Sequence, residues 1–185
     1  IVIDPVGVSG SSYRREKCLE LMKIIHPTCI GGNYSEIQAL LHNCGTVTGV
    51  DAAEDALAEA EETDLPELMK QYAKENQMIL VASGETDLIT DGSCVYRCHN
   101  GSPMMARITG SGCMSTVMLG AFLSAENSVE SAVACCAFTG IAGELAAKEM
   151  TAQKRGTMTF RNWFIDAVSL MTPEQLEHGT NVDWF

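Results

Sequence analysis

The stretch Met78-Ile79-Leu80-Val81-Ala82, followed directly by Ser83-Gly84, indicates the fold class. Five consecutive apolar residues without polar alternation are typical of a strand that is buried on both faces, as in a sheet covered by helices. The Ser-Gly pair then ends the run with a turn. This stretch therefore predicts a central strand of an α/β sheet.

Apolar strand segments alternate with helical patterns on both sides of this strand. Before it, we expect a buried strand at residues 1–3, a helix at 12–25, a short strand from residue 28 that ends at Gly31-Gly32, and a helix from a cap at Asn33 or Ser35 to Leu41. A further helix at 68–74 is expected directly before the strand. After the strand, we expect a hairpin at residues 88–96 and helices at 114–124, 128–150 and 160–170. The order predicts one domain over residues 1–185, a three-layer α/β/α fold with a mostly parallel sheet. The polar segment after residue 170 is expected to be an exposed end.

Composition limits the classes of function. With 185 residues and 46% hydrophobic content, the chain has apolar material for one core but is short for two domains. Its net charge of −12 argues against nucleic acid as a partner, because that binding depends on Lys and Arg contacts. ATP remains compatible, since backbone N–H groups, a helix N-terminus and a metal ion hold phosphates without a basic surface.

No feature of the sequence points to a membrane or to secretion. The first residues lack the basic and apolar regions of a signal peptide, so we expect a cytoplasmic protein. The longest apolar run, residues 132–143, is shorter than the roughly 18 residues of a membrane span, and we interpret it as part of a core helix.

The eight cysteines lie in apolar or helical contexts and lack the regular spacing of a disulfide scaffold, so we expect them to be reduced. Cys94, Cys98 and His99 form a cluster without a second ligand pair at zinc-finger spacing. We interpret them as ordinary residues of a strand and a turn.

Two acidic residues follow expected strands. Asp4 comes just after the first strand, and Glu36 lies in the first turn of the helix after the second. Each residue alone is explained by capping a turn or a helix. Together, at the carboxyl ends of strands, they are what a Mg²⁺ ion that bridges phosphates requires.

Two glycine-containing turns complete the candidate site. Ser83-Gly84-Glu85 offers a hydroxyl and a close-approach glycine where a phosphate fits, although an ordinary turn explains it equally. Gly110-Ser111-Gly112-Cys113 precedes a small-residue helix, whose free N–H groups would cradle a phosphoryl group. Cys113 is either a functional thiol at the helix N-terminus or a packing residue.

Several segments together resemble one family, the hydroxyethylthiazole kinases, in order and approximate spacing. These segments are Asp4-Pro5-Val6, Gly32-Asn33-Tyr34-Ser35-Glu36-Ile37, Gly49-Val50-Asp51, Ser83-Gly84-Glu85-Thr86-Asp87 and Arg107-Ile108-Thr109-Gly110-Ser111-Gly112-Cys113. The likeness runs through essentially the whole chain, and it implies the ribokinase-like fold. Most relatives in that fold carry aspartate where this family has the final cysteine.

The resemblance implies a kinase that transfers phosphate from ATP to the primary alcohol of 4-methyl-5-(2-hydroxyethyl)thiazole in thiamine biosynthesis. Asp4 and Glu36 then correspond to the Mg²⁺-associated acids, and Ser83, Gly31 and Asn33 to the ATP-binding residues. Gly31 departs from the family, which usually has an ATP-contacting arginine there, so one charge-assisted contact is missing.

For the alcohol, the resemblance implies that Gly110, Ser111 and Gly112 form the anion-binding and substrate-binding turn. Cys113 takes the position of the general base. Family members form trimers with active sites at subunit interfaces, so a homotrimer is expected on the same ground. The N-terminal third of the family pattern is not found in this sequence.

Other functions remain open. A kinase for another vitamin precursor, such as a hydroxymethylpyrimidine, or an ATP-dependent dehydratase fits the same fold. Gly110-Ser111-Gly112-Cys113 also resembles a nucleophile elbow, in which Cys113 would attack an acyl group with help from a histidine. A nucleotide-binding homologue without turnover is the alternative that Gly31 and the missing N-terminal third suggest.

Overall fold

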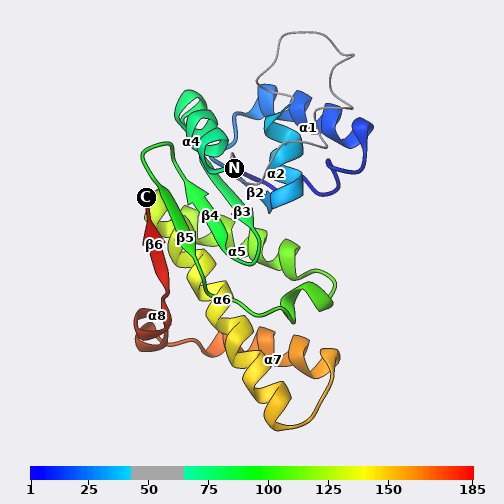
Figure 1. Cartoon of the computed structure of the whole chain (residues 1–185), viewed down its shortest axis with the longest axis vertical. Helices are drawn as coiled ribbons and strands as arrows, with labels where there is room; N and C mark the ends of the chain where they lie inside the picture. The colour runs from blue at the N-terminus through cyan, green and yellow to red at the C-terminus, as the bar shows by residue number, and fades with distance from the viewer. Residues whose placement is uncertain (43–64) are drawn as a thin grey trace.

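A computed structural model describes residues 1–42 and 65–185 of the chain (Figure 1). The family segment Gly49-Val50-Asp51 lies outside the described residues. The description therefore covers the candidate site residues but not this motif.

The sheet is mixed, with the strand order β1-β2-β3-β4-β5-β6. Its strands are β1 (Val2–Ile3), β2 (Cys29–Asn33), β3 (Ile79–Ser83), β4 (Asp87–Thr90), β5 (Val95–Cys98) and β6 (Val182–Trp184). Strands β1, β2 and β3 are parallel to one another, while β4, β5 and β6 each pair antiparallel with the strand before them.

The expectation of a mostly parallel sheet is therefore wrong. Short turns connect β3 to β4 and β4 to β5, and a parallel pair needs a crossover of about a dozen residues or more. Helices connect the parallel strands β1, β2 and β3. Strands β4 and β5 are antiparallel because short turns connect them to the strand before.

Helices cover both faces of the sheet (Figure 1). Helices α1 (Ser12–Ile25), α2 (Tyr34–Leu41) and α4 (Leu65–Asn76) pack in one core with Leu80 of β3. Helices α5 (Ser111–Ala125) and α6 (Val129–Ala152) pack on the other face in a second core with Val81. Neighbouring residues of β3 thus point into different cores, which confirms the expected layers.

Helix α6 continues beyond the sheet and carries the C-terminal elements. Phe160 and Phe164 of α7 (Thr157–Leu170) pack against Ala142 and Ala146 of α6. By length and composition alone α6 is able to cross a membrane, but 61% of its apolar window is buried in the protein, as in a core helix.

The segment after residue 170 is not merely an exposed end, contrary to the sequence prediction. Thr172 and Gln175 form a capping box around Pro173, and this local signal starts α8 (Pro173–Gly179). Strand β6 follows and extends the sheet beside β5. The strand was not predicted because its pairing partner lies some 85 residues earlier in the chain.

The first two strands also differ from the sequence prediction. Residues 1–3 do not form a fully buried strand, because β1 lies at the edge of the sheet and Ile1 is 67% exposed. Strand β2 does not end at Gly31-Gly32 but continues to Asn33, the cap of α2. The two glycines bring β2 close to its neighbours: a Cβ at Gly32 would lie 3.1 Å from Pro5 Cγ.

Candidate active site

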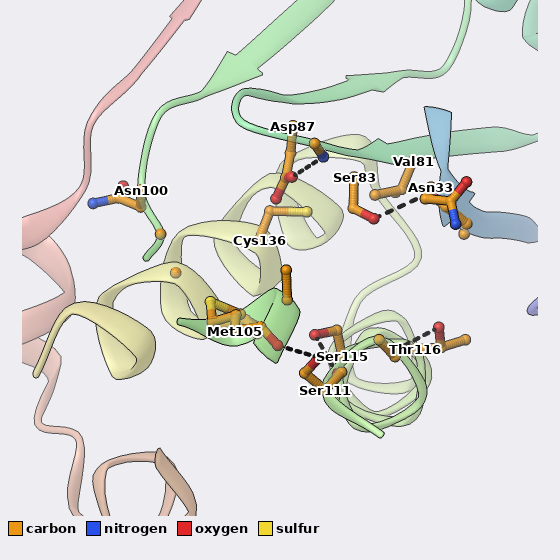
Figure 2. Close-up of a pocket in the computed structure, with 18 of the residues that line it drawn as sticks. Asn33, Val81, Ser83, Asp87, Asn100, Met105, Ser111, Ser115, Thr116 and Cys136 are labelled. Atoms are coloured by element: carbon orange, nitrogen blue, oxygen red, sulfur yellow. Dashed lines mark hydrogen bonds between the residues drawn. The ribbon is translucent and has the colours of Figure 1, made fainter. Parts of the chain in front are cut away.

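A cavity of about 990 Å³ opens where β2 and β3 end (Figure 2). Figure 2 shows Asn33, Ser83 and Asp87 at the strand ends, with Ser111, Ser115 and Thr116 across from them on α5. The remaining walls come from the 99–106 loop and from α6. The cavity thus lies at the carboxyl ends of parallel strands, where open α/β sheets bind ligands.

Most of the residues predicted for the site line this cavity. They are Asp4, Gly31, Asn33, Glu36, Ser83, Ser111 and Gly112. Gly110 and Cys113 are not among its lining residues, and Cys113 is exposed. The fold therefore gathers the expected metal and ATP residues, whereas Cys113 lies in the adjoining first turn of α5.

The two acidic residues lie close enough to interact. Burial raises the pKa of Asp4 above its usual value, and the negative charge of Glu36 raises it further, while a hydrogen bond from Thr116 acts in the opposite direction. Thr116 Oγ1 donates that bond to Asp4 Oδ2 over 3.0 Å. A cation bound between Asp4 and Glu36 would therefore stabilise the ionised form of Asp4.

Backbone donors fix the orientation of Glu36. Gly7 N donates to Glu36 Oε1 over 2.8 Å, and Asn33 N donates to Glu36 Oε2 over 3.1 Å. The second bond belongs to a capping box, because the Asn33 side chain accepts in return from Glu36 N. Glu36 is therefore held by backbone N–H groups at both carboxylate oxygens, and it lines the cavity.

These oxygens fit a magnesium ion. Mg²⁺ is usually bound by one or two carboxylates together with water and substrate phosphates, not by a full protein cage. Within residues 1–42 and 65–185, no group of three or more His, Cys, Asp or Glu side chains could hold a metal ion. Asp4 and Glu36 thus suit a metal that shares its coordination with phosphates.

The turn at residues 83–87 carries Ser83 and is held at several points. Ser83 Oγ donates to Gly32 O over 3.3 Å, which ties the turn to β2. Gly84 N donates to Asp87 Oδ1 over 3.0 Å, and the Tyr34 hydroxyl donates to Thr86 O. A Cβ at Gly84 would lie 3.0 Å from the Tyr34 ring, so a larger residue there would require the ring to shift by a few tenths of an ångström.

Asp87 is a site residue that sequence reasoning did not assign. Burial raises the pKa of Asp87 to about 6, and its bond from Gly84 only partly offsets this. The three-residue spacing from Gly84 to Asp87 in the quoted motif was the available signal, because Asp side chains can bond backbone groups three residues earlier in the chain.

The N-terminus of α5 faces the cavity with free backbone donors. Gly110, the cap residue, has a φ of 94°, and the structure shows no side-chain cap there among the described residues. Ser111 Oγ donates to Met105 O over 2.8 Å, which joins the helix start to the 99–106 loop. This terminus is available to an anionic group at Ser111 and Gly112.

Sequence reasoning also missed the wall formed by α6 and the 99–106 loop. Cys135, Cys136 and Thr139 line it, and burial raises the pKa of Cys135 to about 12 and that of Cys136 well above its usual value. Both thiols are therefore neutral at ordinary pH. The small residues of α6 indicate only a packing helix, and no pattern in the sequence marks it as a cavity wall.

The remaining predictions for cysteines concern disulfides, the neighbourhood of Cys98 and His99, and the acyl-transfer role of Cys113. Seven of the eight cysteines lie in the described residues, and none of these seven forms a disulfide there. His99, next to Cys98, bonds Asp183 and Thr86 through its two ring nitrogens. The described structure shows no hydrogen bond between Cys113 and an imidazole, as the acyl-transfer alternative would need.

The fold and the cavity define an α/β protein with a ligand site at the carboxyl ends of its parallel strands. Residues 1–174 match the hydroxyethylthiazole kinase family. The chain belongs to this family, which confirms the resemblance found in its motifs.

Individual relatives agree with this assignment. The chain is 38% identical to hydroxyethylthiazole kinase 1 of Methanosphaera stadtmanae over 175 residues, which cover 91% of this chain and 61% of that protein. It is 34% identical to hydroxyethylthiazole kinase of Staphylococcus carnosus over 185 residues, covering 99% of this chain and 67% of the relative.

A solved structure shares the fold. The hydroxyethylthiazole kinase protein from Pyrococcus horikoshii OT3 superposes with a TM-score of 0.80 at 26% identity, covering all of this chain and 65% of that one. The chain spans about 61% of the length of the first of these curated relatives and up to 68% of others.

Proposed function

We propose that this protein transfers the terminal phosphoryl group of ATP to the primary alcohol of 4-methyl-5-(2-hydroxyethyl)thiazole, in thiamine biosynthesis or salvage. Family membership supports the reaction class. The observation that carries the proposal is the convergence of Asp4, Glu36, Ser83 and the N-terminus of α5 on one cavity. Phosphoryl transfer needs mainly positioning and charge stabilisation, and these groups supply both.

Asp4 and Glu36 would hold Mg²⁺, which neutralises charge on the phosphates when it is bound. The bond from Thr116 favours the ionised form of Asp4, and the capping box keeps Glu36 in place. Ser83 and Asn33 line the same cavity as these acids. The Asn33 side-chain NH₂ would donate to phosphate oxygens, and Ser83 Oγ would do so in exchange for its bond to Gly32 O.

The transferring group would lie at the start of α5. Backbone N–H groups of Ser111 and Gly112 would stabilise its negative charge, as at other helix N-termini that bind phosphate. Cys113 would accept or guide the alcohol proton from the same helical turn. Because Cys113 is exposed, the alcohol would approach from the open side of the cavity.

Gly31 supports a second candidate, a homologue that binds nucleotide without turnover. Family members usually have an arginine at this position, whereas here β2 offers no side chain to the cavity at residue 31. Phosphate affinity would then depend on backbone donors, the neutral side chains of Ser83 and Asn33, and the metal, without a charged side chain at residue 31. A homotrimer with interface sites and a cytoplasmic location belong to the leading proposal and rest on resemblance and sequence.

A turnover assay with a panel of alcohols tests the proposal. Purified protein with ATP and Mg²⁺ should phosphorylate the hydroxyethylthiazole faster than a hydroxymethylpyrimidine or a simple primary alcohol. Preference for the pyrimidine would identify a different vitamin-precursor kinase. Calorimetric binding of ATP without phosphorylation of any alcohol would favour the homologue without turnover.

A further inference from the structure

A line of four side chains connects the cavity to the C-terminal strand. His99 Nδ1 lies 3.2 Å from Thr86 Oγ1, and His99 Nε2 lies 3.0 Å from Asp183 Oδ2. Asp183 also forms an ion pair with Arg97. Thr86 and His99 line the cavity, so the line runs from its wall to β6.

The register of β6 places Asp183 at this point. Asp183 pairs with Arg97 across the antiparallel strands β5 and β6. The tail is fixed next to His99 as well, because His99 N donates to Asn181 O over 2.9 Å and Asn181 N donates to Asn100 Oδ1 over 2.8 Å. Residues 181–184 lie beyond residues 1–174, which match the family. They nevertheless bond His99 and Asn100 in the cavity wall.

The contacts of His99 determine what each ring nitrogen does. Hydrogen bonds from His99 and from Arg97 lower the pKa of Asp183, which is therefore a carboxylate and accepts from His99 Nε2. In the neutral ring, Nδ1 is then left to accept from the Thr86 hydroxyl. Asp183 thus sets both the orientation of the ring and the partner of Thr86.

Thr86 connects His99 to the 83–87 turn. Its side chain is held by His99, while its carbonyl oxygen accepts from the Tyr34 hydroxyl. The same turn presents Ser83 and Gly84 to the cavity. A turn fixed at Thr86 keeps the Ser83 hydroxyl in one place.

We propose that His99 and Asp183 are positioning residues, which hold the 83–87 turn in the geometry that binds the phosphates of a nucleotide. This inference rests on the proposed function for the identity of the ligand. The side chains of Arg97, Asp183 and His99 are 43%, 49% and 34% exposed. Exposed ion pairs contribute little to folding, so their loss should affect ligand binding more than stability.

The test uses variants that break single contacts. Asp183→Asn removes the carboxylate charge, and Thr86→Val removes the hydroxyl without touching β6. His99→Gln keeps a donor near the Nε2 position but loses Thr86, whereas His99→Asn keeps a group near Nδ1 but loses Asp183. Glu20→Gln is the matched control, because it breaks the exposed pair of Lys17 and Glu20 on α1.

The expected result is a rise in the KM for ATP of roughly 3- to 10-fold for Asp183→Asn, Thr86→Val and His99→Gln, the size of one lost hydrogen bond. The kcat should change less, and Glu20→Gln should behave as the parent. The Thr86→Val, Asp183→Asn double variant should be no worse than the poorer single variant, because both act through His99. His99→Asn should fall between the parent and His99→Gln.

Two measurements do not depend on turnover. Calorimetry should show the same loss of ATP affinity, and amide hydrogen exchange should quicken at residues 84–87 while the rest of the chain is unchanged. If the parent phosphorylates no alcohol, the proposed function fails, but these measurements still test the positioning role.

Three outcomes would overturn the inference. If Asp183→Asn and His99→Gln have the same ATP affinity and amide hydrogen exchange as the control Glu20→Gln, the contacts of His99 do not position the turn. Additive losses in the double variant would show that Thr86 and Asp183 act independently. Faster exchange throughout the chain would show a general structural role.

Discussion

Thr116 on α5 donates a hydrogen bond to Asp4, a residue 112 positions earlier that follows β1. The bond joins one of the two carboxylates of the candidate metal site to the helix whose N-terminus faces the same cavity. Because it opposes the effect of burial on the pKa of Asp4, its removal should weaken the metal site.

Substitutions at the metal site should therefore have graded effects. We expect Asp4→Asn and Glu36→Gln to weaken the dependence of rate on Mg²⁺ strongly, and Thr116→Val to raise the Mg²⁺ concentration for half-maximal rate by roughly 2- to 10-fold, the net size of one ordinary hydrogen bond. The measurement is a Mg²⁺ titration at fixed ATP. Ser124→Ala is the control, since Ser124 bonds only its own helix at the exposed end of α5. Normal titrations in Asp4→Asn and Glu36→Gln would remove both acids from the site.

Cys113 distinguishes a general base from a packing residue. If it accepts or guides the alcohol proton, Cys113→Ala should lower kcat by about 10²- to 10⁴-fold. Cys113→Asp should keep much of the activity, because a helix N-terminus favours a carboxylate. ATP affinity measured separately would show whether the glycine turn is intact. Turnover of Cys113→Ala at the parental rate would mean that the turn and the metal suffice, and loss of activity in both Cys113→Ala and Cys113→Asp, with ATP affinity retained, would point to covalent chemistry at the sulfur.

Gly31 tests the missing arginine. The structure gives Gly31 no positive φ, so the backbone accepts a side chain, although a Cβ there would lie 3.1 Å from Leu119 Cδ2. We expect Gly31→Arg to lower the KM for ATP by adding a charge-assisted contact, after a small shift of Leu119. Gly31→Ala controls for the steric change. A folded Gly31→Arg that binds ATP no better than Gly31→Ala would show that phosphate recognition has been supplied elsewhere.

Asp87 should make stability depend on pH. Its pKa is about 6 in the folded protein against the ordinary 3.8 of an aspartate, so between these values the folded state retains a proton that the unfolded state has released. Its contribution to the free energy of unfolding therefore falls as pH rises from about 4 to about 6, by roughly 2–3 kcal/mol, and is constant above that. Asp87→Asn lacks this titration.

Urea unfolding of the parent and Asp87→Asn at several pH values checks this prediction. The difference in free energy should change below pH 6 and run level from about pH 7 to 8, which is an internal control. A constant difference over the whole range would mean that the half-buried Asp87 does not have a raised pKa.

Substitutions at two helical glycines test whether the 99–106 loop packs directly against α6. A Cβ at Gly140 of α6 would lie 2.5 Å from Asn100 O, whereas at Gly120 of α5 the nearest atom would be Val2 Cγ2 at 3.9 Å. Gly140→Ala should destabilise the fold by about 1–3 kcal/mol through overpacking. Gly120→Ala should be neutral or stabilising by up to about 1 kcal/mol through helix propensity. Equal melting temperatures would show that the loop does not rest on α6.

Local signals made part of the fold predictable. The apolar run at β3, the Asn33 cap of α2 and the turn between β4 and β5 were all confirmed, because each depends on residues near one another in the chain. The positions of Asp4, Glu36 and Ser83 at strand ends followed from the same signals. Their chemical roles remain predictions.

Long-range contacts were not predictable in this way. The addition of β6 to the sheet, the bond from Thr116 to Asp4 and the connection of His99 with Asp183 join residues from 84 to 112 positions apart. A hydrogen bond of this kind depends on where two elements are placed in space, and no pattern of neighbouring residues encodes that distance.

By itself, the sequence determined the kind of elements, the family motifs and the candidate chemistry, because propensities, caps and spacings act over a few residues. Only the tertiary structure decided that the sheet is mixed and that the predicted acids share a cavity with Asp87. It also decided that Cys113 lies outside the cavity lining while Ser111 and Gly112 lie within it. The physical reason is that packing of α5 and α6 on one face of the sheet sets which side of each turn meets the ligand site.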